Sequence, residues 1–105
     1  MTYIATLNDN FRHTFIGGQV LLTAGIAAMS SEDKANIISM VRNFNDFTPA
    51  NDVYGEHDFF SIDYKGNKIF AKIDYYDLNY EFMSEDPANP DITNRVLTIV
   101  LAEEW

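Results

Sequence analysis

A histidine and an aspartate of a predicted β-hairpin are the residues whose types and spacing are best suited to chemistry. Residues 58–64 and 68–76 alternate as strands around the turn signal Lys65-Gly66-Asn67. Because side chains alternate between the two faces of a strand, a regular hairpin places His57 directly or diagonally opposite Asp74. A carboxylate beside an imidazole favours the charged ring and orients it. Such a pair can serve as a general base or as part of a metal site.

Two roles for these residues stay open. As an enzyme, the protein would be a small hydrolase or a metal-dependent enzyme that uses His57 and Asp74, with Glu56 as an auxiliary acid or base. More commonly, such a pair on the polar face of a hairpin is a contact that only stabilises the fold. We expect no metal and no cofactor, because zinc needs three or four ligands and the other histidine, His13, ends a predicted helix.

Negative charge is concentrated in one part of the chain. The net charge is −9, and residues 52–91 hold ten acids against three lysines. Such a field repels nucleic acid and anionic membranes and attracts basic protein surfaces, although solubility alone also explains it. Exposed aromatic rings among the acids would provide anchors on a partner. The candidate partner-binding residues are Phe59, Asp63, Asp74, Tyr76, Asp77, Tyr80, Glu81, Glu85, Asp86 and Asp91.

Two amphipathic helices are predicted in the first half of the chain. The first begins at Thr2, its N-cap, and runs to about residue 13, and Gly17-Gly18 stops it. The second is capped by Ser30 or Ser31 and ends before the boundary at Thr48-Pro49. Their apolar stripes are Tyr3, Ile4, Leu7 and Phe11 in the first helix, and Ile37, Ile38, Val41 and Phe44 in the second.

Strands account for most of the remaining chain. Besides the hairpin, residues 19–23, 80–83 and 96–102 are predicted as strands, and the last is apolar enough to lie centrally, covered on both faces. We therefore predict a single α+β domain over residues 1–105, with an about five-stranded, largely antiparallel sheet and two helices packed on one face. The expected core side of the hairpin is Phe60, Ile62, Tyr64, Ile69, Ala71 and Ile73.

Several classes of protein are excluded or disfavoured by composition. Without cysteine, the chain has no disulfide, thiolate zinc site or cysteine nucleophile. The N-terminal residues lack the basic and apolar regions of a signal peptide. No apolar run reaches the roughly 20 residues of a membrane helix. We expect a soluble, cytoplasmic protein.

Longer phrases of the sequence are similar to those of one protein family. LNDNFR, GGQVLLTAGI, FNDFTPANDVYGEHDF, KIDYYD and RVLTIVLAEEW resemble the DUF3768 proteins, a bacterial family of unknown function. The resemblance implies no established activity and assigns no site residue. It does imply an association with plasmids and other mobile elements, among small proteins linked to DNA maintenance and evasion of restriction.

We therefore expect a non-enzymatic interaction protein. It would inhibit a host nucleic-acid-handling defence complex, of the anti-CRISPR or anti-restriction type, by occupying a basic groove. The expected partner is a basic protein surface, such as that of a nuclease or of a CRISPR or restriction effector subunit, and not nucleic acid or membrane. A homo-oligomer, paired through the aromatic face or through the edge at residues 80–83, is a further alternative.

Overall fold

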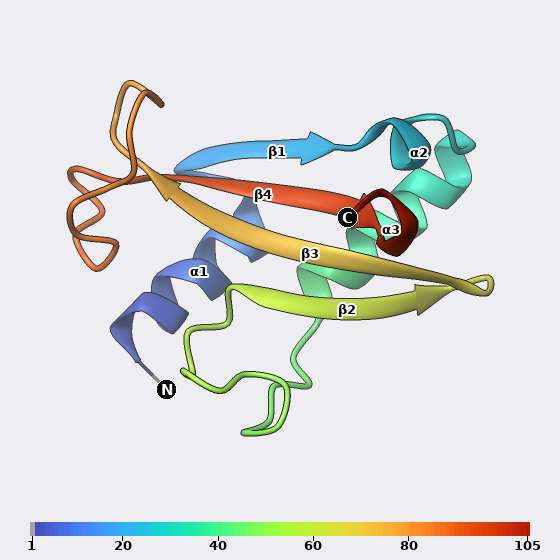
Figure 1. Cartoon of the computed structure of the whole chain (residues 1–105), viewed down its shortest axis with the longest axis horizontal. Helices are drawn as coiled ribbons and strands as arrows, with labels where there is room; N and C mark the ends of the chain where they lie inside the picture. The colour runs from blue at the N-terminus through green and yellow to red at the C-terminus, as the bar shows by residue number, and fades with distance from the viewer. Residues whose placement is uncertain (1) are drawn as a thin grey trace.

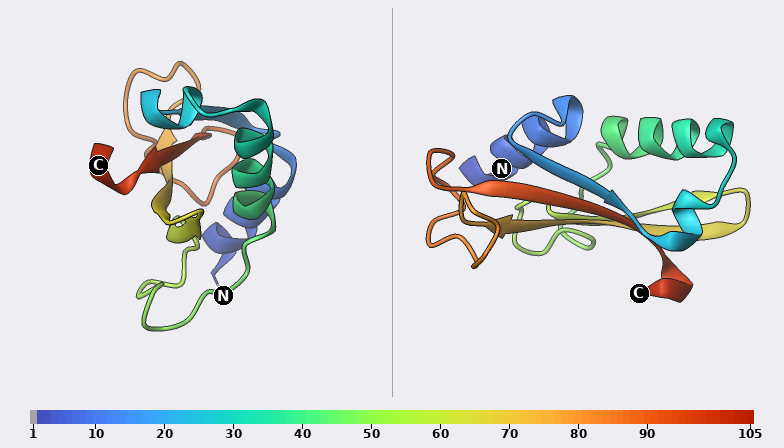
Figure 2. Two further views of the ribbon diagram at one scale, coloured as in Figure 1. Left: turned by 90° about the vertical axis from the view of Figure 1, so that its right-hand side faces the viewer. Right: turned by 90° about the horizontal axis from the view of Figure 1, so that it is seen from above.

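Four strands form a mixed sheet, and two long helices cover one of its faces in the computed structural model, which describes residues 2–105 (Figures 1 and 2). The strand order is β1-β4-β3-β2, with β1 parallel to β4 and the other neighbours antiparallel. In chain order, the elements are α1 (Tyr3–Thr14), β1 (Gly18–Leu22), α2 (Ala24–Ala27), α3 (Ser31–Asn43), β2 (Phe59–Tyr64), β3 (Asn67–Tyr76), β4 (Asn94–Leu101) and the 3-10 turn η1 (Ala102–Glu104).

The predicted α+β class is confirmed, but the predicted sheet is not exact. The sheet has four strands and one parallel pair, not about five strands in a largely antiparallel arrangement. Residues 80–83 contribute only an isolated bridge between Tyr76 and Met83. The reason is a tight turn, in which the Asp77 carboxylate accepts the main-chain N–H groups of Asn79 and Glu81 and leaves no length for a paired strand.

The hairpin forms in one of the two registers that the sequence allows. Tyr64 pairs with Asn67, so the loop is Lys65-Gly66. Both loop residues have positive φ, 48° and 82°, as a type I′ turn requires. The predicted core side is confirmed for Phe60, Ile62, Ile69, Ala71 and Ile73, which are buried, while Tyr64 packs partly buried against them.

Both predicted helix N-caps are confirmed. The Thr2 hydroxyl accepts the Ala5 N–H at 3.1 Å, and the Ser30 hydroxyl accepts the Asp33 N–H at 3.0 Å. The central position of the C-terminal strand is also confirmed, since β4 lies between β1 and β3 and its Leu97 is fully buried. These features depend on contacts within a few residues or on a continuous apolar run.

The predicted apolar stripe of α1 is partly wrong. Tyr3 is 59% exposed, whereas the buried residues of this helix are Ala5, Asn8, Phe11 and Arg12. Asn8 and Arg12 can be buried because other elements provide hydrogen-bond partners for them. The side of α1 that faces the interior is therefore the one that carries Asn8 and Arg12, and not the one that carries Tyr3.

The end of α1 also differs from the prediction, whereas the end of α3 agrees with it. The αL residue that ends α1 is Phe15, so Gly18 does not stop the helix and is the first residue of β1. A Cβ atom on Gly18 would lie 1.8 Å from the main-chain oxygen of Arg95, so the close approach of β1 and β4 requires glycine there. The second long helix, α3, ends at Asn43, before Thr48-Pro49.

The second face of the sheet carries an aromatic cluster. The Phe59, Phe70 and Trp105 rings lie 5.4 to 5.5 Å apart, centroid to centroid. The chain reaches this face through η1, which lies on the opposite side of the sheet from α1 and α3 (Figure 2). Within residues 2–105, no helix is both long and apolar enough to cross a membrane.

Candidate functional site

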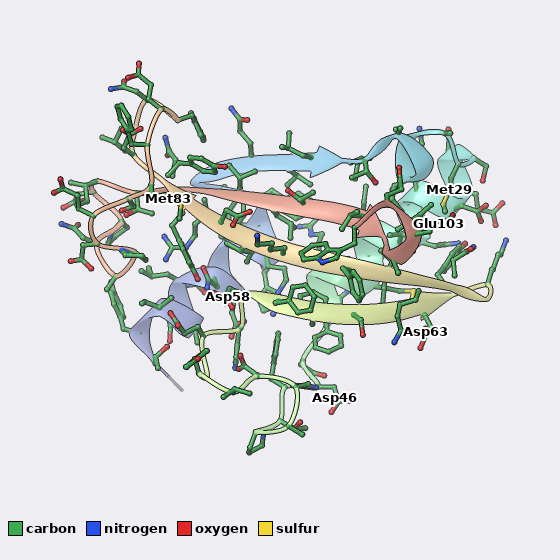
Figure 3. All side chains as sticks on the ribbon, in the orientation of Figure 1. Met29, Asp46, Asp58, Asp63, Met83 and Glu103 are labelled. Atoms are coloured by element: carbon green, nitrogen blue, oxygen red, sulfur yellow. The ribbon has the colours of Figure 1, made fainter. Side chains whose placement is uncertain are left out.

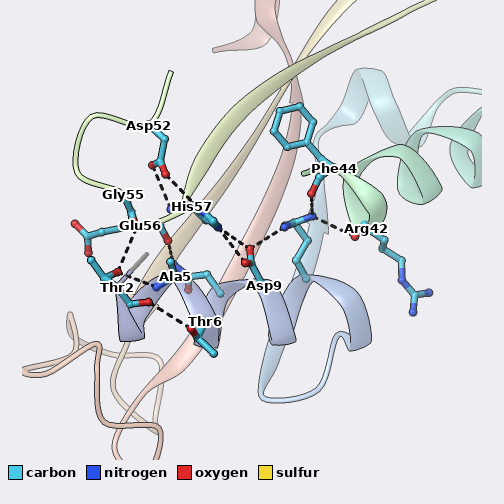
Figure 4. Close-up of polar contacts among 12 residues, drawn as sticks. Thr2, Ala5, Thr6, Asp9, Arg42, Phe44, Asp52, Gly55, Glu56 and His57 are labelled. Carbon is cyan, nitrogen blue, oxygen red and sulfur yellow. Dashed lines mark hydrogen bonds and ion pairs between the residues drawn. The ribbon is translucent and has the colours of Figure 1, made fainter. Parts of the chain in front are cut away.

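The predicted pairing of His57 with Asp74 is wrong. The backbone turns before β2, where Gly55 and His57 have φ values of 66° and 56°, so strand alternation does not extend back to the histidine. The imidazole instead points toward α1, and its Nδ1 lies 3.0 Å from both carboxylate oxygens of Asp9 (Figure 4). Asp74 has Lys72 as its charged neighbour, at 3.2 Å.

His57 is held on several sides. Its Nε2 lies 3.4 Å from Asp52 Oδ2, and its main-chain N–H donates to Asp52 Oδ1. The Phe47 ring stacks on the imidazole at 3.9 Å between centroids. Because each ring nitrogen faces a carboxylate, neither is left for a substrate in this arrangement. The geometry ties the segment 44–58 to α1.

Arg12 extends this arrangement into the protein interior. Its side chain is 1% exposed, and its Nη2 donates to Asp9 Oδ1 at 2.9 Å. Its Nη1 donates to three main-chain oxygens at the C-terminal end of α3, those of Val41, Arg42 and Phe44, at 2.7 to 3.1 Å. These carbonyls have no partner within the helix, so the guanidinium serves as a cap from another element. We call Asp9, Arg12, Asp52 and His57 the histidine network.

A second buried arrangement, the asparagine network, is centred on Asn8, which is fully buried. Its Nδ2 donates to the Glu56 main-chain oxygen at 2.9 Å and to the Tyr75 hydroxyl oxygen at 2.8 Å. Its Oδ1 accepts Arg95 Nε–H at 2.7 Å, and Tyr75 donates its own proton to Asp58. Burial raises the pKa of the Tyr75 hydroxyl and lowers that of the Arg95 guanidinium. Every polar atom of the Asn8 amide group is thus engaged.

Glu56, the predicted auxiliary acid or base, enters the asparagine network through its main-chain oxygen. Desolvation raises the pKa of its carboxyl, and the nearby charges of Asp58 and Asp52 raise it further. Within residues 2–105, no three or more histidine, aspartate or glutamate side chains are grouped as the ligands of a metal ion.

Sequence reasoning missed Asn8, Asp9, Arg12 and Arg95. Two signals were present. Asn8 and Arg12 are four positions apart and therefore share a face of α1. Asp9 and Arg12 are likewise an i, i+3 pair of opposite charge. Both patterns are also typical of an exposed helix face, so they did not indicate burial.

The predicted partner-binding residues fall into two groups. Phe59, Asp63 and Asp74 lie on β2 and β3. Asp63 lies near the turn of the hairpin, whereas Met83 lies in the loops at the opposite end of the sheet (Figure 3). We call residues 77–93 the acidic loops. The remaining candidates lie at or in these loops: Tyr76, Asp77, Tyr80, Glu81, Glu85, Asp86 and Asp91.

The acids of the acidic loops have different roles. Asp77 accepts two main-chain N–H groups of its own loop, and Asp86 accepts that of Ala88. The exposed carboxylates of Glu81, Glu85 and Asp91 form no hydrogen bond or ion pair with any residue in the range 2–105. These three carboxylates are therefore available to an external cation.

Fold and site together define a small acidic α+β protein with two partly buried polar networks and an acidic end. The chain belongs to the DUF3768 family, described as a protein of unknown function, whose model matches residues 22–104. The resemblance of the longer phrases to this family is thereby confirmed, although α1 with Asn8, Asp9 and Arg12 precedes the matched range. No match was found among curated proteins or among solved structures.

A substitution at His57 distinguishes its structural role from that of an exposed histidine. We expect His57→Ala to lower the free energy of unfolding by about 2 kcal/mol, because Asp9 and Asp52 lose the imidazole that both contact and Phe47 loses its stacking partner. His13→Ala is the matched control, since His13 is exposed, and should change stability by less than about 0.5 kcal/mol. Urea denaturation measures both values, and equal stabilities for the two variants would contradict the assigned role.

Proposed function

We propose that this protein is a small acidic interaction module that binds a basic protein surface. The inhibited partner would be a subunit of a host nucleic-acid-handling defence complex, of the anti-CRISPR or anti-restriction type. Occupation of a groove that otherwise holds a phosphate backbone would block that partner. No catalytic step is part of this proposal.

The observation that carries the proposal is the set of free carboxylates in the acidic loops. Glu81, Glu85 and Asp91 are exposed, and the acidic loops that contain them lie at one end of the sheet (Figure 1). The net charge of −9 adds a long-range field of the same sign. Such a field steers a basic partner and can raise its association rate by roughly 10- to 1,000-fold at low salt. The mobile-element association that the family resemblance implies is consistent with an antagonist of host defence.

The enzymatic alternative loses its structural basis, because His57 and Asp74 do not form a pair. A hollow of about 440 Å³ does lie beside His57 and Asp52, with Phe47 and Tyr54 in its lining. However, both ring nitrogens already face carboxylates. We therefore assign the histidine network to stability and do not propose a hydrolase.

The test is affinity capture from host lysate at low and high salt, with mass spectrometry of the retained proteins. We expect a stoichiometric nuclease or effector subunit whose retention falls as the salt concentration rises. The triple variant Glu81→Lys, Glu85→Lys and Asp91→Lys should lower its affinity at least ~10-fold at low salt. Asp86 is left unchanged because its carboxylate stabilises its own loop.

A second triple variant controls for total charge. Glu32→Lys, Asp46→Lys and Glu103→Lys reverse three exposed acids outside the acidic loops, so both variants have the same net charge. The control variant should retain most of the binding. Equal binding by the two variants would contradict a site in the acidic loops. A captured partner without a basic surface would contradict the proposed function itself.

A further inference from the structure

Beyond their charge, the acidic loops expose five large apolar side chains. Phe82 is 71% exposed, Met83 is 65% exposed and Ile92 is 39% exposed. Leu78 and Tyr80 in the same loops are exposed as well. Soluble proteins rarely leave large contiguous apolar patches in water unless the patch binds something. The composition of these loops therefore suggests a docking surface with both charge and apolar area.

Three of these side chains share one hollow. Phe82, Met83 and Ile92 line a depression of about 320 Å³, together with the carboxylate residues Asp77 and Glu85. Its apolar walls suit an aliphatic or aromatic side chain, because burial of that group removes apolar surface of both partners from water. The two acids at its margin suit a lysine or arginine next to that side chain.

The loops that carry the hollow are well supported. The main-chain N–H of Asp77 donates to the Phe82 oxygen at 2.8 Å, and that of Ser84 donates to Tyr75 at 3.0 Å. The hydroxyls of Ser84 and Thr93 lie 2.6 Å apart and join the two loops. Exposed apolar side chains on a supported backbone are organised before binding, which lowers the entropic cost of association.

Further bonds connect the loops to the sheet. Asn94 Nδ2 donates to the Leu78 oxygen, and Arg95 Nη2 donates to the Pro87 oxygen. The second of these bonds connects the acidic loops to the asparagine network, because Arg95 also donates to Asn8. The buried network therefore helps to position the surface.

Charge decides between the classes of occupant. Nucleic acid and anionic membranes are repelled by the free carboxylates around the hollow. A second copy of this chain would bring the same acids against each other, at a net charge of −9 per chain. A basic protein segment that carries an apolar side chain complements both the negative charge and the apolar lining of the hollow.

We propose that the hollow between Phe82, Met83 and Ile92 takes an apolar side chain of a basic partner segment, while neighbouring lysines or arginines of that segment bind Glu81, Glu85 and Asp91. This inference rests on the proposed function and deepens it. It defines the ligand as an amphipathic basic protein segment. Charge then directs the encounter, and the apolar contact provides most of the discrimination between basic partners.

Two labelled synthetic peptides of equal length and charge test the inference by fluorescence anisotropy. In one, lysines alternate with leucine and phenylalanine, and in the other, serine replaces every apolar residue. We expect the protein to bind the apolar peptide ~10-fold more tightly or better, as burial of one large apolar side chain predicts. Amide chemical shifts should change most at Phe82, Met83 and Ile92.

Matched variants assign that preference to the hollow. The double variant Phe82→Ser, Met83→Ser should bind both peptides equally. The control, Val53→Ser with Tyr54→Ser, changes two apolar side chains that are 76% and 82% exposed on another loop, and it should keep the preference. A preference that survives in the Phe82, Met83 variant overturns the inference. A dimeric wild-type protein together with a monomeric Phe82, Met83 variant would also overturn the inference, because the hollow would then bind a second copy of the chain.

The outcomes separate this inference from the proposed function. One outcome is that the wild-type protein binds both peptides equally and that the reversal of Glu81, Glu85 and Asp91 abolishes the binding of both. The electrostatic mechanism then stands, and the apolar contact is wrong. If the preference is present but the reversal has no effect, the apolar contact stands and the electrostatic mechanism is wrong. Absence of binding to either peptide overturns the apolar contact, while the capture experiment still decides the proposed function.

Discussion

Replacement of Arg12 by methionine is expected to destabilise the protein by about 3 kcal/mol or more, as for other buried ion pairs that lose one partner. Methionine preserves most of the apolar stem, so the loss reports mainly on the guanidinium. Without it, the main-chain oxygens of Val41, Arg42 and Phe44 lose their donor at the end of α3. Asp9 also loses one of its two side-chain partners, Arg12, and keeps only His57.

Arg42→Met is the matched control for this variant. Arg42 is exposed, donates to the main-chain oxygen of His13 and stacks on Phe15. Its replacement should cost less than about 1 kcal/mol, as is usual for an exposed charged side chain. The loss of stability in Arg12→Lys should lie between those of Arg12→Met and Arg42→Met, because an ammonium group keeps the charge but not the planar geometry of the guanidinium. Urea denaturation with matched m-values measures all three, and equal losses for Arg12→Met and Arg42→Met would contradict the capping role.

Asn8→Ala is the second substitution with a large expected effect, about 2 to 4 kcal/mol of lost stability. The change leaves Arg95 Nε without its acceptor in a buried position, and it removes the donor to both the Glu56 oxygen and the Tyr75 hydroxyl. Alanine has the higher helix propensity, so any loss arises from the network and not from α1 itself.

Asn10→Ala makes the same chemical change on the exposed face of the same helix. We expect this control to leave stability unchanged or to raise it slightly, because alanine is the better helix former. Thermal unfolding followed by circular dichroism compares the two variants. A loss for Asn8→Ala no greater than that for Asn10→Ala would show that the asparagine network contributes little. Because Arg95 also binds Pro87, faster amide exchange in the acidic loops is expected in the Asn8 variant.

The sequence by itself determined the features that depend on short-range interactions. Thr2 and Ser30 cap their helices through bonds to the residue three positions ahead. The alternation around the Lys65-Gly66-Asn67 turn signal determined the core side of the hairpin, because both registers that the sequence allows place the same residues on that side. The apolar run of β4 predicted its central place, since only a strand covered on both faces tolerates such a run. Family membership was also recognisable in the phrases themselves.

Only the tertiary structure decided the partners of the polar residues. A backbone turn at Gly55 and His57 directs the imidazole to Asp9, 48 positions away, and not to Asp74. Asn8 binds Arg95 across 87 positions, so no local pattern could indicate that both are buried. In the acidic loops, Asp77 closes a tight turn where a fifth strand was predicted, and this turn exposes Phe82. A hydrogen bond requires its two atoms to meet within a few tenths of an ångström, and only the assembled elements define that position.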